Sequence, residues 1–102
     1  MTFARVGIFD TGGRPVDPVV TLFRDRITPK FETLDGFLGY QAFVEPGASR
    51  YVGISYWDSL AHLQASEEVA AGARKEAAVL GALVVGDPMI VRQAFDTRKA
   101  VF

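Results

Sequence analysis

The sequence contains no cysteine, no asparagine and only one histidine, His62, among its 102 residues. The absence of cysteine excludes disulfides, thiolate nucleophiles and Cys-based metal or iron–sulfur sites. One histidine and scattered carboxylates do not build a metal site or a Ser-His-Asp triad, so we expect no bound metal. No P-loop and no glycine-rich dinucleotide fingerprint occurs either. Composition therefore removes most of the common catalytic machinery.

Charge of one sign and long apolar runs are also lacking. Eleven basic and twelve acidic residues nearly cancel, and no five like charges follow one another, so nucleic acid and anionic membranes are not expected partners. The N-terminus carries Arg5 and Asp10 within its apolar stretch, and no later run is long enough to span a membrane. We expect a cytoplasmic protein with a single domain over residues 1–102, near the size at which oligomerisation often adds necessary burial.

The stretch from Asp35 to Ser66 organises the rest of the chain. Two runs rich in Phe, Tyr, Val and Ile, Phe37–Val44 and Arg50–Trp57, flank the turn residues Glu45-Pro46-Gly47-Ala48-Ser49, which predicts a β-hairpin. Asp58 and Ser59 follow at once and can cap a helix, so the chain is expected to turn directly from strand to helix.

The remaining elements are predicted from periodicity and from the positions of Gly and Pro. Alternation predicts a strand over residues 3–9, and apolar spacings of three and four predict a helix from Asp17-Pro18 to Leu34, kinked at Pro29. The other expected elements are a short helix from Leu60 that bends near Ser66, a second helical run ending at Gly81, a strand at 89–95 and a tail at 97–102. Residues 83–85 form an apolar segment whose secondary structure the sequence does not decide.

This order, strand, helix, strand, strand, helix, strand, predicts an α+β protein with a ferredoxin-like split βαβ sandwich, an antiparallel four-stranded sheet with helices on one face. Each strand carries large apolar residues on both parities, whereas a sheet with one wet face should alternate cleanly. Four such strands make a face of roughly 300 Å². Because so large an apolar patch is seldom left exposed, we expect a homodimer in which two sheets pack face to face.

Gly36-Phe37-Leu38-Gly39-Tyr40, the hairpin, and Tyr56-Trp57-Asp58-Ser59-Leu60 resemble the antibiotic biosynthesis monooxygenase (ABM) family of dimeric α+β barrels, over nearly the whole chain. The resemblance implies a ligand pocket between the sheet and the helices of each subunit. It also implies an activity, the cofactor-independent oxygenation of an electron-rich phenol or quinol, so no cofactor is expected. The alternative is a non-catalytic dimeric module that binds a ligand or has a structural role.

Trp57 matches the Trp at the strand end of this family, where it lines the pocket of haem-degrading relatives. The alternative is a core residue that packs the helix against the sheet. By resemblance, haem degradation also needs an Asn on the first strand and a His in the helix after the Trp. Gly7 stands at the first of these places, and Ser66, Glu67 and Glu68 stand near the second, so haem degradation is disfavoured.

Other candidates are weighed in the same way. His62 has a pKa suited to proton transfer, but Leu60 and Leu63 direct the buried side of their helix away from it. Arg5 and Arg92 are expected on neighbouring strands, either in salt bridges to Glu45, Asp96 or Glu32, or steadying a substrate phenolate.

The expected ligand is a small, flat, largely apolar molecule. Gly7 and Gly53 share the parity of Phe9 and Trp57 and could leave room for it, whereas the face of Gly39 depends on the hairpin register. The candidate substrate-binding residues are Trp57, Tyr40, Tyr56 and Arg92, and no catalytic base is identified.

Overall fold

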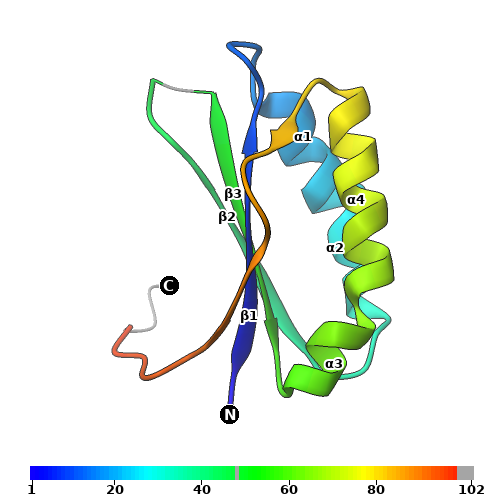
Figure 1. The fold of residues 1–102 in the computed structure, drawn as a ribbon, viewed down its shortest axis with the longest axis vertical. Helices are drawn as coiled ribbons and strands as arrows, with labels where there is room; N and C mark the ends of the chain where they lie inside the picture. Colours follow the sequence, from blue (N-terminus) through cyan, green and yellow to red (C-terminus); the bar gives the residue numbers. More distant parts are fainter. Residues whose placement is uncertain (48, 99–102) are drawn as a thin grey trace.

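A computed structural model describes residues 1–47 and 49–98 of the chain. The elements in chain order are β1 (Phe3–Asp10), α1 (Asp17–Leu22), the π-helical turn η1 (Phe23–Ile27), α2 (Thr28–Glu32), β2 (Phe37–Val44), β3 (Arg50–Trp57), α3 (Leu60–Ala65), α4 (Glu67–Val79), β4 (Leu83–Val84) and β5 (Met89–Arg92). The helices cover one face of an antiparallel sheet and leave the other face open (Figure 1). The predicted α+β, ferredoxin-like class is confirmed.

The sheet has five strands among the described residues, where the sequence predicted four. The order is β2-β3-β1, and both β4 and β5 lie along the far edge of β1. The sequence left the secondary structure of residues 83–85 undecided, and in the structure Leu83–Val84 form β4 against the end of β1. A turn at 86–88 then returns the chain to the same edge of β1 as β5. The last strand ends at Arg92 instead of residue 95, and the predicted tail lies outside the described residues from position 99 onward.

The irregular first helix has a local cause. Pro29 has no backbone N–H and would leave a carbonyl without a donor in a regular α-helix. The chain widens just before it, so that the N–H of Thr28 bonds to the carbonyl of Phe23, five residues back. The sequence predicted a kink at Pro29, and the structure places a π-helical turn over Phe23–Ile27 instead, which keeps the apolar stripe continuous.

Register fixes which strand residues face the helices. Tyr51, Ser55 and Trp57 on β3 are buried beneath the helices. Strand residues of the opposite parity form the open face, which comprises Ala4, Val6, Ile8, Asp10, Gly39, Gln41, Phe43, Arg50, Val52, Ile54, Tyr56, Leu83, Met89 and Val91. The open face is therefore largely apolar, with the Asp10–Arg50 ion pair at one end, and Phe43 and Met89 are 52% and 59% exposed on it.

A register shift between Phe37 and Gly39 answers the question that the sequence left open. Phe37 pairs with Trp57 and Gly39 pairs with Tyr56, so Leu38 is the extra residue of a β-bulge. Gly39 therefore shares the parity of the open face, while Tyr40 returns to the helix side opposite Ser55.

Within the described ranges, no helix combines the length and apolar character needed to cross a bilayer.

Candidate functional site

A cavity of about 40 Å³ lies between the sheet and the helices. Its floor is formed by alternate residues of β1 and β3 and by one residue of β2. Its roof is formed by residues of η1, α2 and α4. The lining residues are Arg5, Gly7, Phe9, Phe23, Phe31, Tyr40, Gly53, Ser55, Ala70, Ala73, Arg74 and Pro88. A cavity needs roughly 10–15 Å³ of such volume for each water, so this space holds a few waters. An aromatic ring can enter only if the walls of the cavity move.

Stacked aromatic rings make the apolar wall. Phe23 stacks against both Tyr40 and Tyr51, with ring centroids 5.9 Å and 5.1 Å away, and Phe31 stacks on Tyr40 at 6.2 Å. The hydroxyls of Tyr40 and Tyr51 are 2.9 Å apart and share a hydrogen bond. Burial raises the pKa of Tyr51 to about 12 and raises the pKa of Tyr40 as well. Both phenols therefore keep their protons near neutral pH and act as hydrogen-bond donors or acceptors, not as bases.

Tyr40 lines the cavity and also reaches the protein surface. A second hollow of about 270 Å³ opens on the surface beside it, lined by Val20, Arg24, Thr28, Tyr40, Ala42 and Tyr51. Tyr40 is the one side chain that lines both spaces. The Tyr40 ring therefore borders both the cavity and the surface hollow.

Gly53 is required by the position of Tyr40. A Cβ added at Gly53 would lie 2.0 Å from the Tyr40 hydroxyl and 3.2 Å from the Tyr51 ring. We expect Gly53→Ala to displace Tyr40, break the hydrogen bond between the two hydroxyls and lower the free energy of unfolding by about 1–2 kcal/mol in urea titrations. Gly72→Ala is the matched control: its Cβ meets nothing within 4 Å, and it should raise stability by roughly 0.5–1 kcal/mol as an alanine within a helix. Equal stability of the two variants would contradict the assigned role of Gly53.

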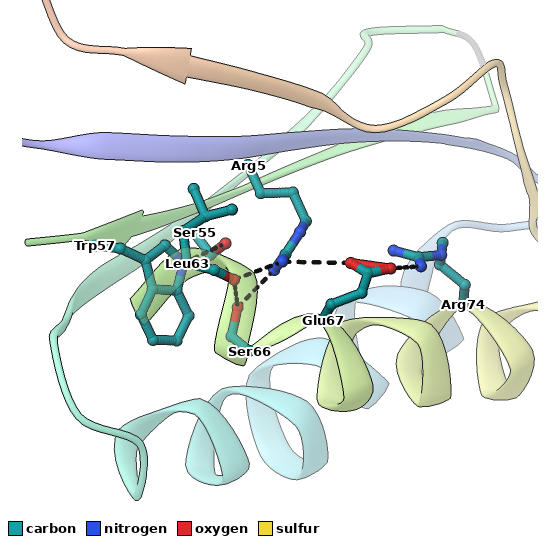
Figure 2. A network of polar contacts seen from close by, with 7 residues as sticks. All are labelled: Arg5, Ser55, Trp57, Leu63, Ser66, Glu67 and Arg74. Carbon is teal, nitrogen blue, oxygen red and sulfur yellow. Dashed lines mark hydrogen bonds and ion pairs between the residues drawn. The ribbon is translucent and has the colours of Figure 1, made fainter. Parts of the chain in front are cut away.

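The polar end of the cavity is built around Arg5, which is 6% exposed. Its Nη1 donates to the Ser66 hydroxyl at 2.9 Å, and its Nη2 donates to the Leu63 carbonyl at 2.9 Å (Figure 2). These partners lie at the junction of α3 and α4, where the Ser66 hydroxyl in turn donates to the Leu63 carbonyl. Arg5 thus ties the first strand to the bend between the two helices.

Glu67 joins two arginines at this end. One of its carboxylate oxygens lies 3.3 Å from Nη2 of Arg5, and the other pairs with Arg74. Burial lowers the pKa of Arg5, and the charge of Glu67 opposes that shift. A guanidinium stays protonated in proteins, so both arginines are cations beside the cavity. The sequence proposed Glu45, Asp96 or Glu32 as partners of Arg5, and this was wrong because Arg5 points under the helices and meets α3 and α4.

The structure places the four predicted ligand-binding residues in four different environments. Tyr40 lines the cavity. Trp57 is completely buried next to it, in edge-on contact with Phe31, and does not line it. Tyr56 lies on the open face and donates to Gln41, and Arg92 is exposed on β5 opposite Phe3.

His62 lies away from the cavity, half-exposed on α3. Its Nδ1 is 2.6 Å from a carboxylate oxygen of Asp58, and this hydrogen bond raises the pKa of His62 and lowers the pKa of Asp58. Among the described residues, the side chains that line the cavity include no histidine and no carboxylate. No three His, Cys, Asp or Glu residues gather as metal ligands in the described ranges.

Sequence reasoning missed the cavity roof and most of its polar end. Phe23, Phe31, Ala70 and Ala73 read as ordinary core positions of amphipathic helices, and nothing in their spacing separates cavity lining from core. Arg74 reads as a surface charge. Gly7 and Gly53 are the exception, because their shared parity with Phe9 and Trp57 pointed to space beneath the helices, and both line the cavity.

No protein-family model matches the sequence, and no curated protein matches it either. Solved structures do resemble the fold. A mutant of SnoaB, a cofactor-independent oxygenase from Streptomyces nogalater, is 20% identical over 96% of this chain and 98% of its own, with a TM-score of 0.70. A monooxygenase from the gene ActVA-Orf6 of Streptomyces coelicolor, solved with the ligand nanaomycin D, is 20% identical over 98% and 90% of the two chains, with a TM-score of 0.69.

A Nitrosomonas europaea protein assigned to the antibiotic biosynthesis monooxygenases gives a TM-score of 0.73 at 10% identity, over 95% of this chain and 94% of its own. These identities are low, so the likeness is one of fold. At that level, the resemblance to the ABM family is confirmed.

Proposed function

We propose that this protein is a cofactor-independent monooxygenase that oxidises an electron-rich phenol or quinol in the cavity between sheet and helices. The observation that carries the proposal is the cavity itself: stacked aromatic rings on one side, cations on the other and two glycines in the floor. Such a site suits a flat ring with an ionisable hydroxyl. Cofactor-independent oxygenases with the same fold support the reaction class.

The chemistry asks little of the protein. A phenolate can itself give an electron to O₂, and recombination forms a carbon–oxygen bond on the ring. Loss of water from the resulting hydroperoxide leaves a quinone, so that phenol plus O₂ gives quinone plus water and every electron comes from the substrate. The protein has to bind the ring, favour its anion and exclude bulk water. The aromatic wall would bind the ring and exclude bulk water, and the arginines would favour the anion.

The second candidate function is a non-catalytic ligand-binding module, which the small size of the cavity favours. Both candidates are compatible with a homodimer formed through the open sheet face, which we propose because that face is largely apolar.

Oxygen uptake tests the enzymatic proposal. In an oxygen electrode without added flavin, haem or metal, the protein should consume one O₂ per substrate molecule with members of a panel of hydroquinones, naphthols and anthrone, and the quinone should appear by absorbance. Ala70→Leu should remove most of this activity because it fills the cavity from the roof. Ala78→Leu, the same change at an exposed site on α4, should not. Uptake above autoxidation that is unaffected by Ala70→Leu would show that the reaction does not take place in this cavity. Uptake that equals autoxidation for the whole panel would favour the non-catalytic module.

A further inference from the structure

We propose that the ligand of this cavity binds as a monoanion, with one oxyanion directed at Arg5 and Arg74, and that Glu67 sets the strength of its binding. The proposal rests on the proposed function for the place of the ligand and adds its chemical class. That class is a small aromatic molecule with a single phenolate or carboxylate group.

The first observation is a donor without an acceptor. Nη1 and Nη2 of Arg5 are bonded to Ser66, Leu63 and Glu67, but the Nε–H is buried and has no partner. Buried N–H groups are almost always paired in folded proteins, so this one calls for a missing acceptor. In Figure 2, Nε lies at the end of the guanidinium nearer β1, whereas the Nη atoms lie at the end nearer Leu63 and Ser66. Because Arg5 and Arg74 both line the cavity, a ligand oxygen atom placed beside them would give the Nε–H of Arg5 its hydrogen-bond acceptor.

The second observation is the charge balance. Arg5, Arg74 and Glu67 carry two positive charges and one negative charge, which leaves a net charge of +1 at one end of an apolar space. Glu67 is half-exposed and does not line the cavity, and no carboxylate does among the described residues. One ligand charge of −1 neutralises the group. In such a poorly hydrated place, the interaction between opposite charges is stronger than in water.

Glu67 acts as a positioning residue. It holds both guanidiniums from the side opposite the ring wall, and its charge weakens their attraction for a ligand anion. Removing that charge while keeping the side-chain shape, as in Glu67→Gln, should therefore tighten the binding of anions and leave neutral rings unaffected. A purely structural role for Glu67 would instead weaken both kinds of ligand together, through loosening of the site.

The test is direct binding to the intact protein, with no oxygen chemistry involved. Benzoate and benzamide form a matched pair of carboxylate and neutral ring for isothermal calorimetry, and 4-nitrophenol reports a phenol because its anion absorbs at longer wavelength. We expect benzoate to bind at least about tenfold more tightly than benzamide, as for a hydrogen bond to a charged group. We also expect the protein to increase the phenolate absorption of 4-nitrophenol at constant pH. A response from only one of the two probes would identify the carboxylate or the phenolate as the preferred source of the charge.

Variants decide between a charged site and general packing. Arg74→Gln should weaken benzoate about tenfold, Glu67→Gln should strengthen it several-fold, and neither should move benzamide more than about twofold. Arg5→Lys keeps the charge but loses the Nε donor, so it should reduce the preference for benzoate over benzamide even if Arg5→Met does not fold. Equal affinities for benzoate and benzamide, or parallel losses of both in Glu67→Gln, would overturn the proposal. Oxygen uptake above autoxidation with the hydroquinone, naphthol and anthrone panel alongside such a result would leave the proposed function standing.

Discussion

Trp57→Ala is expected to lower the free energy of unfolding by about 3–5 kcal/mol, because a large buried side chain is lost and a cavity remains. Trp57 has no exposed surface, and its ring meets Phe31 and Phe37 edge-on at centroid distances of 5.6 Å and 5.2 Å. Its indole N–H donates to the Ser55 hydroxyl at 3.0 Å, so the substitution also removes a buried hydrogen bond. Domains are commonly stable by only about 5–15 kcal/mol, so the variant is close to unfolding.

Urea titration followed by far-UV circular dichroism measures this effect, and two controls interpret it. Trp57→Phe should recover most of the lost stability, because the ring contacts are kept and only the indole N–H and some volume go. Tyr56→Ala, one residue away on the open face, should cost the monomer clearly less, since its side chain is only half-buried. If Trp57→Ala unfolds at the wild-type urea concentration yet loses binding of aromatic ligands, Trp57 belongs to the ligand site instead of the core.

Ile54→Lys is expected to convert a dimer into a monomer at micromolar concentration. Ile54 lies on the open face in the middle of the sheet, paired with Val6 on one side and Gln41 on the other. A face of roughly 300 Å² in projection, more with its side chains, can form the apolar centre of an interface, and a lysine placed there would be buried without a partner. The helix-side core is untouched, so the monomer should keep its secondary structure.

Size-exclusion chromatography with light scattering measures the change in mass. Val79→Lys is the matched control, because Val79 is an apolar residue that is 86% exposed at the end of α4, on the helix side of the molecule. It should leave the mass of the assembly unchanged. A monomeric wild-type protein, or loss of the dimer in Val79→Lys but not in Ile54→Lys, would show that the open face is not the interface.

The sequence by itself determined most of the elements and the arrangement of helices on one face of a sheet. Two runs rich in Phe, Tyr, Val and Ile and the turn residues at 45–49 predicted the bounds of β2 and β3, and Ser59 caps the helix that follows, accepting from the His62 N–H. Apolar residues on both strand parities indicated a sheet with two apolar faces, one of which the helices cover. These features are local or periodic, so neighbouring residues are sufficient to specify them.

Only the tertiary structure decided the site. Arg5 and Ser66 are 61 positions apart, and nothing in the chain between them encodes that β1 passes beneath the junction of α3 and α4. The bulge at Leu38 decided that Tyr40 faces the cavity and Gly39 does not, because a single inserted residue exchanges the two faces of a strand. Whether an aromatic residue fills the core, as Trp57 does, or lines a space, as Tyr40 does, depends on how three strands and two helices pack together. Contacts between segments distant in sequence therefore created the cavity and its charged end, and sequence periodicity carries no record of them.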